Sequence, residues 1–191
     1  MYKRQLLVDR PLFQKRRCYQ LTLRAAKLLG VSDKLGKPIA EETKITAVAT
    51  LVFCRLSEVI REKLTIKELN QHAPGLVQPR RANHFYLDMT GGRPRLSSIR
   101  VDRGSQSEWT SLIQRCARDF SKRYNGNPSY QQLVDDGAAS FTVLTPFEEK
   151  KEQLDILFAD PEKNLPIPVR VHVVEEIFHM LPNLRRSRES A

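Results

Sequence analysis

Apolar residues recur at helical spacing in two long stretches of the chain, and both stretches predict amphipathic helices. The first runs from Glu42 to Lys63, and the second from Ser105 to Tyr124. In the second stretch Trp109 and Phe120 stand three turns apart on one stripe, so we expect both to be buried. The first stripe consists of Ile45, Val48, Ala49, Val52, Leu56, Val59 and Ile60.

Shorter segments between and after these helices predict strands. Asn83–Met89 and Leu96–Asp102 flank a Thr-Gly-Gly turn and predict a hairpin, whereas Ala139–Leu144 is typical of a buried strand. Further helices are expected at 65–72, 129–135, 146–160 and 175–181, with a last strand at 168–174. From Glu42 onward helices and strands therefore alternate as in a mixed α/β core.

The first part of the chain has a different pattern. Residues 6–22 predict two short strands around a turn at Asp9-Arg10-Pro11, and Thr22 is a good N-cap for a short helix that Gly30 ends. A strand pair beside a helix is typical of the end of a winged helix-turn-helix. We therefore divide the chain into a partial winged helix at 1–36, an α/β core at 42–182 and a basic tail at 183–191.

Charge adds a prediction about the partner. The 191 residues carry 32 Lys and Arg against 22 Asp and Glu, a net charge of +10. The excess is uneven, because residues 76–125 hold ten basic residues and four acids, whereas residues 134–163 hold eight acids and three lysines. Such a basic segment favours a phosphate-rich partner, because each neutralised phosphate releases a counterion. Scattered, solvated charge is the alternative.

Cysteine usage and hydropathy predict a cytoplasmic protein with no membrane partner. Cys18, Cys54 and Cys116 are widely spaced and form no C-x-x-C pair, which argues against disulfides and a zinc site. No apolar run reaches membrane-spanning length, and no secretory signal opens the sequence.

Two aspartates at strand ends are the candidate catalytic residues. Asp88 ends the first strand of the predicted hairpin and Asp102 the second. Carboxylates that converge there, joined by Glu58 from the preceding helix, would bind Mg²⁺ as nucleases do. Arg100, however, stands two residues before Asp102, where such a site needs an acid. Aspartates that flank a turn are the alternative, and the four histidines show no ligand spacing, so we expect no cofactor unless the core is active with Mg²⁺.

Two segments resemble a known family. Residues 17–30 resemble the Y-x-L-T-x-x-G-A-x-L-L close of a winged helix, and Ile99–Gly104 resembles the L-E-V-D-R-G strand of the plasmid replication-relaxation family, related to C-type mobilisation relaxases. The resemblance implies a winged helix before a restriction-endonuclease-like core. It also implies a basic helix with a tyrosine after the strand, which Arg115, Arg118, Lys122 and Tyr124 match.

The sequence departs from that family at two acids. The family's P-D-G is Ala82-Asn83-His84 here, and its glutamate is Arg100. The resemblance therefore implies a core without catalysis that still binds DNA. The codons ATG-TAT-AAG-AGA-CAG for residues 1–5 match the end of a transposon adapter used in sequencing libraries, so we interpret these residues as a sequencing artefact and expect the native chain to begin earlier.

Three hypotheses follow. The first is a DNA-binding protein of a plasmid or other mobile element, and the second is an active metal-dependent nuclease or relaxase that uses Asp88 and Asp102. The third is a regulatory module whose basic face binds a protein. The expected partners are DNA and a second copy of the chain. The residues predicted to bind DNA are Arg10, Lys15, Arg16, Arg17, Arg100, Arg103, Arg115, Arg118 and Lys122.

Overall fold

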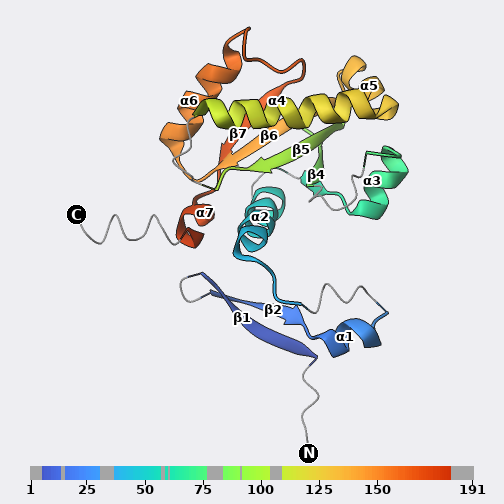
Figure 1. Ribbon diagram of the computed structural model, residues 1–191, viewed down its shortest axis with the longest axis vertical. Helices are drawn as coiled ribbons and strands as arrows, with labels where there is room; N and C mark the ends of the chain where they lie inside the picture. The colour runs from blue at the N-terminus through green and yellow to red at the C-terminus, as the bar shows by residue number, and fades with distance from the viewer. Residues whose placement is uncertain are drawn as a thin grey trace, which may run out of the picture. The chain divides into compact units, whose positions relative to one another are not determined.

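A computed structural model describes residues 6–13, 16–30, 37–56, 59, 61–76, 84–90, 92–103 and 109–181 (Figure 1). The chain forms two compact units. The first comprises Met1–Ile45 with His179–Ala191, and the second comprises Thr46–Phe178.

The first unit contains a hairpin and a short helix. Strands β1 (Leu7–Phe13) and β2 (Arg16–Leu21) pair antiparallel, and α1 (Leu23–Leu28) follows. The Thr22 hydroxyl accepts a hydrogen bond from the Ala25 amide at 3.2 Å, so the predicted N-cap is confirmed. Gly30, at φ +63°, follows the helix in a conformation that favours glycine.

The predicted turn within this hairpin is wrong. Asp9, Arg10 and Pro11 lie inside β1 and pair with Tyr19, Cys18 and Arg17 of β2. The register shifts between Pro11 and Phe13. A two-stranded ribbon tolerates a proline beside such an irregularity, because the missing N–H need not break a regular ladder.

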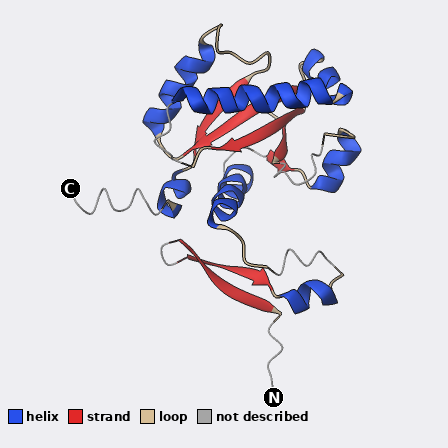
Figure 2. Cartoon of the chain, in the orientation of Figure 1, coloured by secondary structure: helices blue, strands red, loops and turns tan. Residues whose placement is uncertain are grey.

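A mixed sheet of five strands lies in the second unit (Figure 2), which confirms the predicted mixed α/β core, although only four of the strands were predicted. In spatial order the strands are β3 (Arg61–Lys63), β4 (Phe85–Asp88), β5 (Arg95–Val101), β6 (Ala139–Thr145) and β7 (Val169–Val173). β3, β4 and β5 pair antiparallel, whereas β5, β6 and β7 pair parallel. Every residue of β6 is buried, as expected for a strand inside a sheet that is covered on both faces.

Helices cover the sheet and enclose the hydrophobic core. They are α3 (Ile66–His72), α4 (Trp109–Gly126), α5 (Pro128–Asp135) and α6 (Glu148–Ala159). A short helix, α7 (Glu175–Met180), follows β7 and crosses the boundary between the units. Figure 1 shows α4 lying along the sheet. The core contains Leu96, Leu112, Phe120, Phe141, Val143 and Leu154, among others. None of the described helices combines the length and apolar character needed to cross a membrane.

The long helix predicted from Glu42 to Lys63 ends early. Helix α2 (Glu41–Leu51) passes into a π-helical turn, η2 (Val52–Leu56), and residues 61–63 instead form edge strand β3. These three residues pair with Asp88, Leu87 and Tyr86 of β4, so their backbone groups complete a sheet that apolar periodicity cannot reveal.

Trp109 is also placed differently from the prediction. It is the first residue of α4 and its side chain is 39% exposed, whereas Phe120 is buried as predicted. Trp109 is partly exposed because it lies almost one turn before Leu112, the first buried residue of α4.

Candidate nucleic-acid interface

The two strand-end aspartates do not converge, and the predicted site made from both is wrong. Because β4 and β5 are antiparallel, Asp88 stands opposite Arg95, whereas Asp102 follows the far end of β5. Seven residues of strand separate these positions, about 23 Å at roughly 3.3 Å per residue. Side-chain alternation also directs Asp88 and Asp102 to opposite faces of the sheet. Glu58 lies outside the described residues.

Asp88 is held in a closed polar cluster. Its side chain is only 1% exposed, and Oδ2 lies 2.5 Å from Nη1 of Arg170 on β7. Oδ1 accepts hydrogen bonds from the Thr90 amide at 2.9 Å and from the Thr90 hydroxyl at 2.5 Å. Burial acts to raise the pKa of Asp88, but the two Thr90 bonds, Arg170 and Arg61 outweigh burial and lower it.

Arg61 and His172 lie on the same face of the sheet as Asp88. The Arg61 guanidinium stands 4.1 Å from the centroid of the Phe53 ring and donates to the Phe53 carbonyl at 3.3 Å. The same ring lies 4.9 Å from the His172 ring. Burial lowers the pKa of His172, and the charges of Arg61 and Arg170 lower it further. This face therefore favours a neutral imidazole.

Asp102 makes a second buried ion pair, on the face that α4 and α6 cover. Its side chain is 5% exposed, and Oδ2 lies 2.6 Å from Lys150 Nζ in the first turn of α6. The Thr145 hydroxyl, at the end of β6, donates to the same oxygen at 3.3 Å. Lys150 Nζ also stands 5.6 Å from the centroid of the Trp109 ring. The pair joins the ends of two parallel strands to α6.

Arg100 is engaged inside the second unit. Its guanidinium forms an ion pair with Asp119 of α4, which directs the side chain toward the helix and away from Asp88. The structure thus places Arg100 in contact with the helix, not among the exposed basic side chains. Arg103, two residues past the end of β5, is exposed.

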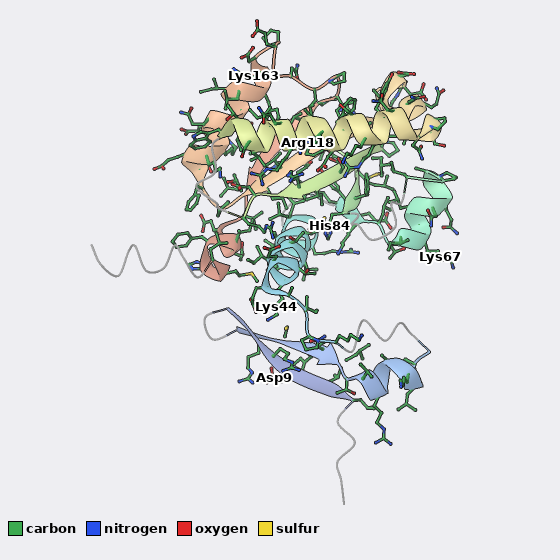
Figure 3. The ribbon with its side chains drawn as sticks, viewed as in Figure 1. Asp9, Lys44, Lys67, His84, Arg118 and Lys163 are labelled. Carbon is green, nitrogen blue, oxygen red and sulfur yellow. The ribbon has the colours of Figure 1, made fainter. Side chains whose placement is uncertain are left out.

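The remaining predicted residues of this unit come together on one helix. Arg115, Arg118 and Lys122, here called the α4 basic stripe, follow i, i+3, i+7 spacing on the side of α4 away from the core. Arg118 and Lys122 are exposed, and Arg118 lies near the middle of the helix (Figure 3). Arg115 donates to the Ser111 carbonyl at 3.0 Å and to its hydroxyl at 2.8 Å.

The hairpin of the first unit presents less charge than the sequence indicates. Arg17 Nε lies 2.6 Å from Oδ2 of Asp9 on the paired strand, and this ion pair offsets its charge. Arg10 is exposed on β1. Lys15 and the side chain of Arg16 lie outside the described residues.

Sequence reasoning missed the cations that hold the two aspartates, Arg170 and Lys150. The only signal for Arg170 is the alternating Val-Arg-Val-His-Val of β7, which places Arg170 and His172 on one face. For Lys150 no local signal exists, because it lies in a helix rich in charge. Within the described parts of the chain no group of three or more His, Cys, Asp or Glu is arranged to hold a metal ion.

Comparison with known proteins returned no match among family profiles, curated sequences or solved structures. The similarity of Ile99–Gly104 to the replication-relaxation strand therefore stays a prediction from sequence.

Proposed function

We propose that this chain binds DNA through the α4 basic stripe and does not catalyse a reaction on it. The observation that carries the proposal is the row of basic residues on the outer side of a helix whose inner side is packed in the core: Arg118 and Lys122 are exposed, and Arg115 is half-buried. A rigid helix holds these cations at fixed spacing, and such contacts to phosphate supply affinity without reading bases.

The charges around the stripe support this assignment. Asp119 is the one acid in the sequence of α4, and the ion pair with Arg100 already offsets its charge. The net charge of the whole chain, +10, adds a long-range attraction for polyanions. A partner with a regular array of negative charge therefore fits the stripe better than an uncharged protein surface.

We propose no catalytic activity because the two candidate aspartates lie far apart and do not form one metal-binding group. Asp88 and Asp102 lie at opposite ends and on opposite faces of the sheet, and each is paired with a cation. The role in a plasmid or other mobile element, and the likeness of the core to restriction endonucleases, rest on the resemblance of Ile99–Gly104. Both are therefore parts of the proposal that only this sequence resemblance supports.

Salt-dependent binding of a labelled DNA duplex tests the proposal. We expect the variant R118A/K122A to bind more weakly, and to bind unrelated sequences equally weakly. The slope of log affinity against log salt should become shallower by about 1.8 units, since each lost phosphate contact removes roughly 0.9.

The matched control is K67A/K163A, which removes the same formal charge from two exposed lysines on α3 and after α6 (Figure 3). This control should leave both the affinity and the salt slope close to those of the unmodified chain. Equal effects of the two double variants would show that total charge, not the stripe, governs binding. No binding at low salt would overturn the proposal.

A further inference from the structure

Three arginines surround one aspartate on a single face of the sheet. Arg61 of β3 and Arg95 of β5 are the direct register partners of Asp88, one on each side of β4. Side chains of directly opposed residues in antiparallel strands share a face, with Cβ atoms about 4.5–5.5 Å apart. Arg170 of β7 completes the group through its ion pair with Asp88. Arg61, Arg95 and Arg170 are here called the sheet arginine cluster.

The cluster holds more positive charge than Asp88 neutralises. Three guanidinium groups face one carboxylate, which leaves a surplus of two positive charges. His172 on β7 senses this surplus, because Arg61 and Arg170 lower its pKa more strongly than Asp88 raises it. Asp155, which also acts to raise that pKa, contributes less still. The electrostatic field at this face is therefore positive.

Two members of the cluster keep donors for a ligand. The side chain of Arg95 is half-buried, and in the described parts of the chain no ion pair or hydrogen bond engages its guanidinium. The side chain of Arg170 is 37% exposed, and it bonds to Asp88 and Thr90 through one nitrogen, Nη1. Each guanidinium carries five N–H donors, so both side chains can also bind an acceptor that arrives from solvent.

We propose that the sheet arginine cluster binds a phosphate dianion, with Arg95 and Arg170 as its ligands. A phosphate group with one ester bond or none carries about −1.5 to −2 charges at pH 7, which matches the surplus. Guanidinium groups bind phosphate oxygens through paired N–H donors, and these charge-assisted bonds are stronger than neutral ones. A carboxylate would balance only half of the surplus charge.

This site is separate from the α4 basic stripe. Alternation along β5 directs Arg95 to one face of the sheet and Arg100 to the other, where Arg100 forms its ion pair with Asp119 of α4. Helix α4 therefore covers the face opposite to the cluster. The inference does not rest on the proposed function, and either can fail without the other.

The melting temperature of the full chain in phosphate tests the site. A ligand that binds only the folded state stabilises it in proportion to its occupancy. We therefore expect a higher melting temperature in sodium phosphate at pH 7 than in sodium chloride of equal ionic strength. Phosphate also stabilises proteins in general because it is excluded from their surface, and this effect should be equal in all variants.

Variants at Arg95 isolate the specific effect. R95Q should weaken phosphate binding about tenfold, because charge-assisted hydrogen bonds are lost, and should reduce the melting difference accordingly. R95K keeps the charge without the planar fork and should recover only part of the binding. The matched control R24Q removes an exposed arginine from α1 and should behave like the unmodified chain. Circular dichroism verifies folding, and R95K carries the test if R95Q does not fold.

Two oligothymidines distinguish the sources of the phosphate group, one with a 5′-phosphate and the other with a 5′-hydroxyl. Tighter binding of the phosphorylated strand, lost in R95Q, would support the site and identify the ligand as a nucleic-acid end. Equal binding of the two strands, together with binding of inorganic phosphate, would support the site and identify a small phosphate compound. R118A/K122A should weaken both strands equally and leave the effect of inorganic phosphate unchanged.

Three results would overturn the inference. The first is an equal melting temperature of the unmodified chain in phosphate and in chloride. The second is a phosphate effect of the same size in R95Q as in R24Q. The third is a rise in acetate as large as that in phosphate, which would exclude selection of a dianion. None of these results bears on duplex binding by the α4 basic stripe, so the two proposals fail separately.

Discussion

Asp88 and Asp102 each show what a buried carboxylate requires. A charged group that leaves water loses its hydration, and an ion pair with further hydrogen bonds is the usual compensation. Asp88 receives Arg170 and two bonds from Thr90, and Asp102 receives Lys150 and the Thr145 hydroxyl. These acceptor oxygens are occupied within the fold, so the two carboxylates act as anchors between distant segments.

His172 predicts a loss of stability in mild acid. Burial lowers the pKa of His172 below the usual 6.5, and Arg61 and Arg170 add to the effect, whereas Asp88 and Asp155 oppose it. The unfolded chain therefore takes up a proton near pH 6.5, and the folded chain does so only at lower pH. Linkage makes this contribution to stability complete above pH 6.5, and it declines as the pH falls below that value.

The measurement is the free energy of unfolding in urea at pH 7, 6 and 5. We expect it to decline toward pH 5 in the unmodified chain, and to decline less steeply in H172Q, which has no ring to protonate. Burial also lowers the pKa of His84, so H84Q/H172Q should flatten the profile further. Parallel profiles for all three proteins would contradict the assignment.

Helix α4 carries two aromatic side chains in different environments, Phe120 in the core and Trp109 partly exposed to solvent. Phe120 is 6% exposed and stacks on Tyr124 with ring centroids 5.5 Å apart. F120A should cost about 3–5 kcal/mol of unfolding free energy, because it leaves a cavity in the core. W109A should cost much less, about 1 kcal/mol, because the indole is partly solvated in the folded state. Urea unfolding of both variants checks this, and losses of equal size would contradict it.

Elements with local signals were predictable from sequence. Helix α3 begins at a capping box in which Thr65 and Glu68 satisfy each other's backbone amides, and α4 shows a full apolar stripe. Strand β3 had no such signal, because residues 61–63 become a strand only by pairing with β4. Trp109 fits the stripe of α4, yet periodicity does not tell where along a helix the core begins.

The arrangement of the candidate site residues was likewise predictable only where those residues are close together in the sequence. Arg118 and Lys122 were identified correctly as residues on one helix, because their spacing is local. The prediction that Asp88 and Asp102 converge was wrong because β4 and β5 run antiparallel. The end of one strand therefore lies beside the start of the other. Arg170 stands 82 residues from Asp88, and only the folded sheet brings them together.

In the second unit as a whole, charge is divided between helices. The sequence of α4 carries four basic residues and one acid, whereas α6 carries Glu148, Glu149, Glu152 and Asp155 against two lysines. Like charges on α6 repel a phosphate backbone, and the α4 basic stripe attracts it. The division therefore favours one orientation of bound DNA on this unit.

The same unit should lack metal-dependent nuclease activity. A divalent cation needs oxygen ligands within about 2.0–2.6 Å of one point, which Asp88 and Asp102 cannot supply together from opposite ends of β5. A metal at Asp102 alone would have to displace the Lys150 ammonium, which already lies 2.6 Å from the carboxylate. Supercoiled plasmid incubated with the chain and Mg²⁺ or Mn²⁺ should remain unnicked.

Two controls test whether any nicking depends on a metal ion bound at Asp102. D102N keeps the size of the side chain and removes its charge, and its melting curve shows whether the variant remains folded beside Lys150. Metal should not raise the melting temperature of the unmodified chain, because a cation that binds only the folded state would stabilise it in proportion to its occupancy. Nicking that needs metal and disappears in a folded D102N would refute the non-catalytic assignment, because such activity requires Asp102 to exchange Lys150 for a metal ion when DNA is bound.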